Sequence, residues 1–140
     1  MKVNPYLNFN GTAEEAFQFY QSVFGGELFI QRMNQAPGTE GLPENEKNLV
    51  MHVCLPIADG QMIMASDIVP SMGHQLTVGN NNYISLMPDS REEMDRIFNG
   101  LSEGGTVEMP LADMFWGDYF GSFKDKYGIG WMLNFANKKQ

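Results

Sequence analysis

Cysteine is almost missing from this chain of 140 residues, which contains only Cys54. A single cysteine cannot form an internal disulfide, so the composition suits a reducing compartment. The first residues also lack the apolar stretch of a secretory signal peptide. We therefore expect a cytoplasmic protein.

Basic residues and long apolar runs are scarce as well. Nine Lys and Arg stand against 17 Asp and Glu, which gives a formal net charge of −8. Phosphate backbones and anionic lipid headgroups repel such a protein. No segment approaches the ~20 consecutive apolar residues that a membrane-spanning helix needs. We therefore expect neither nucleic acid nor a membrane as a partner.

Apolar packing residues, in contrast, are plentiful. Hydrophobic residues make up 43% of the chain and aromatic residues 12%, while charged residues make up only 19%. This is the composition of a packed globular protein and is too apolar for disorder. The length and composition predict a single folded domain over residues 1–140.

The chain contains an internal repeat. Thr12–Glu15 and Ser90–Glu93 each match a capping box, and each is followed by apolar residues at helical spacing and then by a glycine pair. These patterns predict helices over 12–24 and 90–102. A short alternating stretch precedes each helix, and residues 60–64 align with 130–134. The repeat predicts two β-α-β-β-β modules, at 1–69 and 82–136, joined by a linker at 70–81.

The predicted fold class is α+β, with a mixed sheet that forms a cleft. A helix on one face of each sheet leaves the other face free, and two such faces brought together would enclose a cleft. Alternation and turn residues predict strands near 3–9, 27–34, 48–56, 61–68, 82–87, 106–109, 119–125 and 130–136.

Several stretches of the chain also match a known superfamily: residues 9–20, 24–27, His52, 62–67, 125–128 and 131–135. In these the chain resembles the vicinal-oxygen-chelate proteins, the glyoxalase/bleomycin-resistance superfamily, and within it the PhnB-like branch. The resemblance implies the two-module fold and a homodimer, with possible exchange of strands or modules. The matching motifs are specific for the fold but indicate no particular reaction, because proteins of this fold have many activities.

The resemblance also implies a divalent metal, held by His, Gln or Glu from four cleft strands. Aligned on the Phe19–Tyr20 helix motif, the ligand positions fall at Pro5, near Met64, at Tyr83 and at Met132. Proline offers no side-chain donor, and thioethers are poor ligands for hard cations. We therefore expect no metal and no other cofactor.

Some members of the branch carry a demethylubiquinone methyltransferase label. A typical Rossmann methyltransferase has a glycine-rich turn between a strand and a helix near the start of an alternating α/β chain. The nearest sequence, Gly128–Gly130, lacks the third glycine and leads into the last predicted strand. The sequence therefore gives no support for that activity.

His52 and Cys54 form one candidate pair. Two residues apart on a strand, they share a face at ~6.5–7 Å. This spacing allows a Cys/His nucleophile, but it equally allows a cleft-lining histidine beside a small core thiol. His74, in the linker, is interpreted as a surface loop residue.

Acidic and aromatic residues complete the candidate site. Asp67 stands at a strand end, which it could equally cap. The stretch Asp113–Asp118 is predicted as a loop rich in large apolar groups, where function is common. The predicted ligand-binding residues are His52, Cys54, Asp67, Asp113, Trp116, Tyr119 and Trp131, and no catalytic residue is assigned.

The predicted function is metal-independent binding of an unknown small molecule, uncharged or cationic and partly aromatic, by a homodimer. One alternative is an enzyme of the same superfamily, a lyase, isomerase or dioxygenase-like protein. It would use His52 or an aspartate with a non-standard or recruited metal. A second alternative is a structural or regulatory dimer whose cleft has lost its function.

Overall fold

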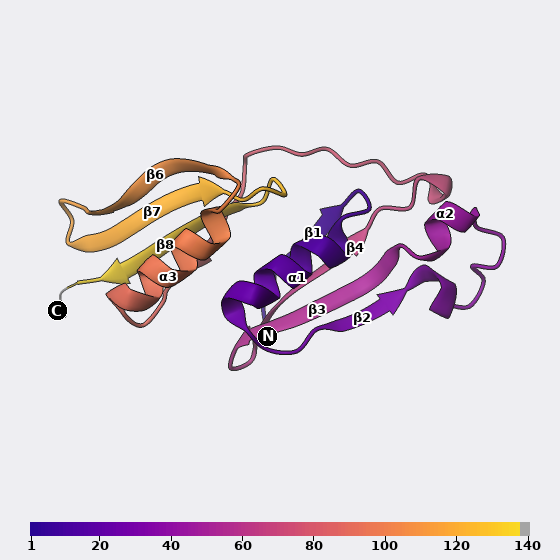
Figure 1. Ribbon diagram of the computed structural model, residues 1–140, viewed down its shortest axis with the longest axis horizontal. Helices are drawn as coiled ribbons and strands as arrows, with labels where there is room; N and C mark the ends of the chain where they lie inside the picture. The colour runs from indigo at the N-terminus through magenta and orange to yellow at the C-terminus, as the bar shows by residue number, and fades with distance from the viewer. Residues whose placement is uncertain (138–140) are drawn as a thin grey trace. The chain divides into compact units, whose positions relative to one another are not determined.

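The computed structural model describes residues 1–137, which divide into two compact units, Met1–Thr77 and the residues from Val78 onward. Each unit is a four-stranded mixed sheet with one long helix against it (Figure 1). In both units the main elements follow the order strand, helix, strand, strand, strand. The predicted repeat of two β-α-β-β-β modules in an α+β fold is confirmed.

Unit 1 contains one long helix, one short helix and four strands. They are β1 (Tyr6–Phe9), α1 (Ala13–Phe24), β2 (Phe29–Arg32), α2 (Glu44–Lys47), β3 (Val50–Ala58) and β4 (Gln61–Asp67), with 3-10 turns at Met33–Gln35 and Pro70–Met72. The strands lie in the order β1-β4-β3-β2. β1 runs parallel to β4, and the other pairs are antiparallel.

Unit 2 repeats this arrangement without the short helix. Its elements are β5 (Ile84–Leu86), α3 (Arg91–Ser102), β6 (Thr106–Asp113), β7 (Asp118–Lys124) and β8 (Gly130–Ala136). The strand order is β5-β8-β7-β6, and β5 is parallel to β8. In each unit the first strand therefore pairs in parallel with the last.

The predicted loop Asp113–Asp118 is shorter than expected. Asp113 is the last residue of β6 and Asp118 is the first of β7, so the turn consists of 114–117. The sequence predicted a strand only near 106–109, which stops before Pro110. β6 is an edge strand with irregular register on both sides of Met109. An edge strand with bulges tolerates proline, because the missing N–H donor falls outside the ladder.

The first turn of α1 differs from the predicted capping box. The Thr12 side chain makes no capping hydrogen bond. Instead, Oδ1 of Asp67 at the end of β4 accepts hydrogen bonds from the backbone N–H groups of Gly11 and Ala13, at 3.1 and 2.9 Å. At α3 the prediction is correct, because Ser90 Oγ accepts from the Glu93 N–H at 3.1 Å. Asp67 supplies to α1 what Ser90 supplies to α3.

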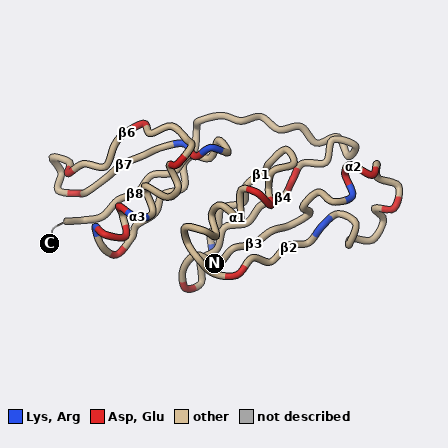
Figure 2. Tube along the Cα trace, in the orientation of Figure 1, with Lys and Arg blue, Asp and Glu red and all other residues tan. Residues whose placement is uncertain are grey.

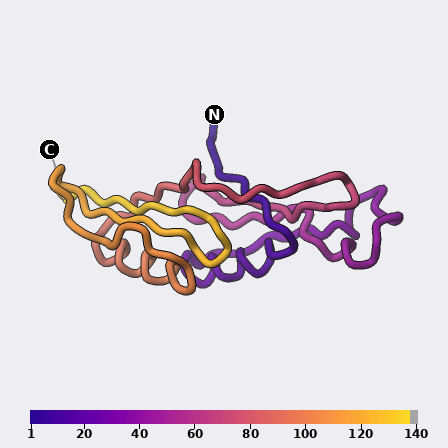
Figure 3. The backbone as a smooth tube through the Cα atoms, turned by 90° about the horizontal axis from the view of Figure 1, so that it is seen from above, coloured from indigo at the N-terminus to yellow at the C-terminus, as the bar shows by residue number. Residues whose placement is uncertain are grey.

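Each unit has its core between helix and sheet. In unit 1 the largest fully buried side chains are Phe17, Tyr20, Val50, Val53, Leu55 and Ile63, and in unit 2 they are Met94, Leu101, Phe123, Trp131 and Leu133. Successive side chains of a strand point to opposite faces, so the residues between these buried ones occupy the other face. In unit 1, α1 and the segment that follows β4 lie on opposite sides of the sheet (Figure 3).

Two of the four inner strands, β3 and β8, carry no charged side chain. Acidic residues occupy the first turns of α1 and α3 (Figure 2). Carboxylates at those positions interact favourably with the positive end of the helix dipole. None of the described helices is long and apolar enough to cross a membrane.

Candidate functional site

The sheet face of unit 1 opposite α1 gathers several large apolar side chains. Phe29, Cys54, Met64 and Tyr6 are register neighbours across the four strands. Tyr6 is 48% exposed and Phe29 is 56% exposed. We call this surface, completed by the polar residues described next, the open face of unit 1. It presents aromatic and sulfur-containing groups to a ligand.

A polar row lies beside the apolar one. Gln31 pairs with His52, and Asn8 pairs with Ser66. The Tyr6 hydroxyl lies 3.3 Å from Nδ1 of His52, and their rings are stacked at 5.8 Å between centroids. These contacts fix the orientation of the His52 ring on the open face.

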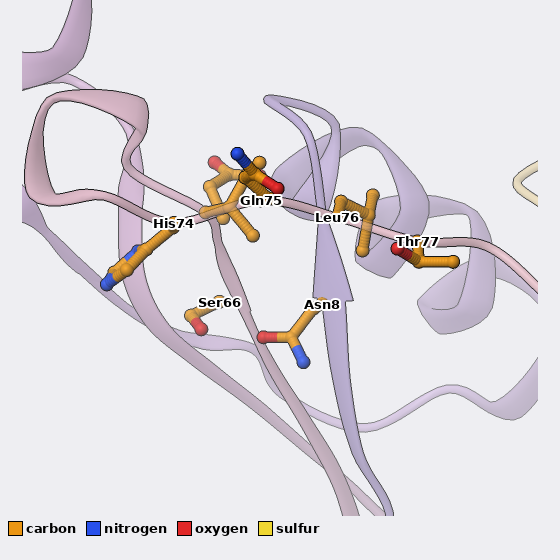
Figure 4. Close-up of a pocket in the computed structure, with 8 residues that line it drawn as sticks. Asn8, Ser66, His74, Gln75, Leu76 and Thr77 are labelled. Atoms are coloured by element: carbon orange, nitrogen blue, oxygen red, sulfur yellow. The ribbon is translucent and has the colours of Figure 1, made fainter.

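A pocket adjoins this polar row. It has a volume of about 470 Å³ and is lined by Asn8, Ser66, Asp67, Ile68 and the segment His74–Thr77. In Figure 4, Asn8 and Ser66 rise from the strands, and the segment His74–Thr77 passes across them. Amides and hydroxyls both donate and accept hydrogen bonds. The pocket therefore matches an uncharged polar group.

Of the residues that line this pocket, the sequence predicted only Asp67, and His74 is one of those it did not predict. Its Nδ1 accepts a hydrogen bond from the Val69 N–H at 2.9 Å. The neutral ring must then carry its proton on Nε2. His74 was interpreted as a surface loop residue because the linker is rich in Gly and Asn and has no periodicity. The local sequence gives no signal that the linker folds back over β1 and β4.

Cys54 lies where the sequence placed it, on the same face as His52. Burial raises the pKa of its thiol above the ordinary value. Its Sγ lies 3.2 Å from Sδ of Met62. Because the thiolate is the nucleophile, a raised pKa weighs against the Cys/His nucleophile.

Asp67 and Trp131, both predicted to bind ligand, are buried within their own units. Asp67 Oδ2 accepts from the Val50 N–H at 2.9 Å, in addition to the two α1 bonds on Oδ1. The Trp131 indole N–H donates to Oδ2 of Asp125 at 2.8 Å. Internal hydrogen bonds therefore account for both side chains without a ligand.

Asp113 and Tyr119 lie together in unit 2, at the start of α3. They are register neighbours on β6 and β7. Arg91 of α3 donates to Asp113 at 2.7 Å, and its guanidinium stacks 3.8 Å from the centre of the Tyr119 ring. Tyr119 donates to Oδ1 of Asp95 at 2.6 Å. This network joins α3 to the sheet.

The same network shifts the pKa values of its members, and Asp113 raises that of the Arg91 guanidinium. Arg91, together with Asn137, holds the pKa of the Asp113 carboxyl below its ordinary value. The hydrogen bond to Asp95 raises the pKa of the Tyr119 hydroxyl. Asp113 is therefore ionised at neutral pH and paired with Arg91. This pairing accounts for the position of Asp113 without a ligand.

Trp116 is the predicted unit 2 residue that lies on an accessible aromatic surface. It stands in the 114–117 turn, is 52% exposed, and meets the Phe120 ring edge to face at 6.4 Å. Phe120 follows Tyr119 on β7 and so points away from α3. Trp116 therefore continues the sheet face of unit 2 that α3 does not cover.

The positions implied for a superfamily metal do not fit a hard divalent cation. Pro5 has only its backbone carbonyl, which accepts from the Met64 N–H. The Tyr83 hydroxyl donates to Glu108 at 2.7 Å, and Met64 and Met132 offer thioethers. Among the described residues, no three His, Cys, Asp or Glu side chains lie together as a metal site would need.

Comparison with known proteins places the chain in a family. Residues 1–134 match the family described as 3-demethylubiquinone-9 3-methyltransferase. Protein YjdN of Escherichia coli strain K12 is 32% identical, over 99% of this chain and 98% of its own length.

Solved structures agree with this match. Protein PA1353 from Pseudomonas aeruginosa is 38% identical with a TM-score of 0.84, over 96% of this chain and 97% of its own. A putative 3-demethylubiquinone-9 3-methyltransferase, PhnB protein, from Bacillus cereus is 29% identical with a TM-score of 0.75, over 97% and 100%.

A more distant structure shares the fold alone. The glyoxalase/bleomycin resistance protein from Albidiferax ferrireducens T118 is 16% identical with a TM-score of 0.67, over 96% of this chain and 98% of its own. The chain therefore belongs to the family described as 3-demethylubiquinone-9 3-methyltransferase, and it shares the fold of the glyoxalase/bleomycin resistance protein.

Proposed function

We propose that this chain binds a small organic molecule on the open face of unit 1, without the divalent metal of its superfamily. The ligand is uncharged or cationic and partly aromatic. The observation that carries the proposal is the continuity of an exposed apolar row with a polar pocket of about 470 Å³.

The apolar row indicates the aromatic part of the proposed ligand. Tyr6 and Phe29 offer aromatic faces, and a stacked ring contributes about 0.5–1.5 kcal/mol beyond the burial of its area. Methionine adapts its shape to planar groups, and Met64 lies between Tyr6 and Cys54 in the sheet. A flat ring is the shape that this row supports.

The polar row and the pocket indicate the polar part of the proposed ligand. His52, Asn8 and Ser66 place hydrogen-bonding groups beside the apolar row, and His74 adds a donor at Nε2. The net charge of −8 disfavours an anionic ligand through the overall field. An uncharged or cationic molecule with hydroxyl or amide groups fits best.

The experiment is a thermal-shift screen of neutral, cationic and anionic aromatic compounds, followed by calorimetric titration in EDTA. His52→Ala and Asn8→Ala should each weaken the selected compound at least about 10-fold, the cost of roughly one good hydrogen bond. Met87→Ala is the matched control, since Met87 is an apolar residue of unit 2 that is 75% exposed and belongs to none of the proposed binding surfaces. Unchanged affinity in both variants, or loss of binding in EDTA, contradicts the proposal.

Trp116 is a further proposed ligand-binding residue, which lies on unit 2. Its aromatic contact with Phe120 supports a role as an apolar wall. Trp116→Ala should then weaken binding while the melting temperature stays within about 2 °C, because a half-exposed turn residue carries little core packing. Equal affinity for wild type and variant removes Trp116 from the proposed ligand-binding residues.

Acid–base catalysis is a second candidate, supported by the contact between Tyr6 and His52 at 3.3 Å. A phenol and an imidazole in contact can pass a proton to or from a bound molecule. The aspartates are weaker candidates, because Asp67 and Asp113 already hold structural partners. If a screened compound turns over, Tyr6→Phe and His52→Gln should lower kcat more than they change KM.

We further propose that the protein is a homodimer. Each unit leaves one sheet face without a covering helix, and large apolar side chains on or beside these faces are exposed, such as Phe29 and Trp116. A second copy is the partner that covers such surfaces at the least cost in polar burial. Light scattering at tens of micromolar should give twice 15.8 kDa; the monomer mass contradicts the proposal.

A further inference from the structure

We propose that Cys54, Met62 and Met64 form a binding site for a soft monovalent metal ion of the copper(I) class. This inference goes beyond the proposed function, because it concerns an ion and not an organic ligand. Its starting point is the misfit described above, in which thioethers occupy positions where the superfamily holds hard donors.

Three sulfur atoms gather on two adjacent strands. Sγ of Cys54 and Sδ of Met62 lie 3.2 Å apart, and Met64 is the register neighbour of Cys54. Met62 and Met64 alternate with buried residues along β4, so both share the open face with Cys54. β3 and β4 run side by side through this unit (Figure 1).

The donor chemistry selects the metal. Thiolate and thioether sulfurs are soft ligands that prefer copper(I), while hard cations prefer oxygen. His52, two residues before Cys54 on the same face, adds an imidazole. A thiolate and two thioethers form a set of three soft donors, with this imidazole on the same face.

Binding is an exchange of a proton for the ion. The Cys54 S–H bond breaks, a sulfur–copper(I) bond forms, and the proton passes to solvent, with no change in oxidation state. Because Cys54 is half-buried and not enclosed, both the ion and the released proton can pass between the open face and water.

The test is an anaerobic titration of the whole chain with copper(I), held reduced by ascorbate and buffered by bicinchoninate. Wild type should retain close to one ion per chain. Cys54→Ser should abolish retention, and Met62→Leu and Met64→Leu should each weaken it by roughly 10- to 100-fold, the cost of losing support around a metal. Met132→Leu, a methionine of the unit 2 sheet, is the matched control and should bind as wild type.

A second readout keeps the test valid if Cys54→Ser folds poorly. Copper(I) should protect Cys54 of wild type from iodoacetamide, and Met62→Leu should remove most of that protection. The proposal is wrong if wild type retains no copper(I). It is also wrong if Met62→Leu and Met64→Leu both bind as wild type, since a lone thiol then explains the binding. Organic ligands are titrated in EDTA without copper, so the two experiments are independent. Absence of copper(I) binding does not contradict organic-ligand binding, and absence of organic-ligand binding does not contradict the copper(I) site.

Discussion

Two buried aspartates organise the two units through backbone contacts. Asp67 accepts three backbone N–H bonds that tie β4 to α1 and β3. Asp125 accepts from the N–H groups of Tyr127 and Ile129 and from the Trp131 indole. A buried carboxylate is stable only where donors surround it. Both aspartates therefore have a role in folding.

This role predicts a large loss of stability from a small change. Asp67→Asn keeps one carbonyl oxygen for Gly11 and Ala13 but turns an NH₂ group toward the Val50 N–H. We expect the free energy of unfolding to fall by about 2–3 kcal/mol, since hydrogen bonds to charged groups contribute about 1.5–3 kcal/mol. Urea denaturation followed by far-UV circular dichroism measures this. Asp59→Asn, at an exposed turn, should change stability little, and equal stability of the two variants would refute the role.

The thiol of Cys54 predicts a pH dependence. Burial favours the neutral thiol over the thiolate, so the pKa lies above its ordinary value. Alkylation by iodoacetamide needs the thiolate. Its rate should therefore be slower at neutral pH than that of a free cysteine derivative, and should rise over a more alkaline range. Mass spectrometry of timed samples measures the rate, and a midpoint at or below that of the free thiol contradicts the prediction.

At the scale of elements, the two long helices offer an internal comparison. They have the same length and the same predicted capping box, yet their first turns are held differently. Ser90 caps α3 with its own side chain, while Thr12 makes no capping bond and Asp67 serves α1. The same sequence pattern therefore provides a side-chain capping hydrogen bond at α3 and none at α1.

Alanine substitution at the two caps should separate these cases. Ser90→Ala removes the bond to the Glu93 N–H and should cost about 1 kcal/mol of unfolding free energy. Thr12→Ala removes no capping bond and should cost less than about 0.5 kcal/mol. Urea denaturation of both variants under identical conditions tests this prediction. A larger loss of unfolding free energy for Thr12→Ala than for Ser90→Ala would mean that the Thr12 side chain does cap α1.

The helices and most strands could be predicted because their signals are local. Capping residues, apolar spacing and glycine pairs all lie within one element, and the repeat checks each module against the other. The end of β6 could not be predicted, because whether Pro110 interrupts a strand depends on the strand being an edge. The cap of α1 could not be predicted either, because Asp67 is 56 positions from Gly11.

The candidate site shows the same limit. Alternation along one strand placed His52 and Cys54 on a common face correctly. Met64 and Ser66 join them through strand register, which no single strand encodes. Trp131 was predicted as a cleft wall, because large aromatic side chains pack against ligands as well as in cores. In the structure Trp131 is fully buried and is part of the core of unit 2.

At the scale of the whole molecule, acidity is the dominant property. Seventeen acidic residues against nine basic ones are distributed over both units (Figure 2). The inner strands β3 and β8 carry no charged side chain, so the acidic field surrounds surfaces that are themselves largely apolar. Such a field attracts cations and repels polyanions.

The field predicts that nucleic acids do not bind. A labelled DNA duplex mixed with the protein at low salt, where phosphate contacts are strongest, should show no change in fluorescence anisotropy up to about 100 μM protein. A basic protein of similar size is the positive control. A salt-sensitive rise in anisotropy would show a local basic surface that overcomes the net charge of −8.

The parallel pairing of first and last strands also has a consequence for synthesis. β1 leaves the ribosome before its partner β4, and β4 and the carboxylate that caps α1 follow more than fifty residues later. Contacts between distant segments form slowly, because a long loop must close before they stabilise anything. The nascent N-terminal strand therefore waits unpaired, with Tyr6 and Phe9 uncovered, until translation passes Asp67. This interval is when the growing chain is most exposed to misassembly or to capture by a chaperone.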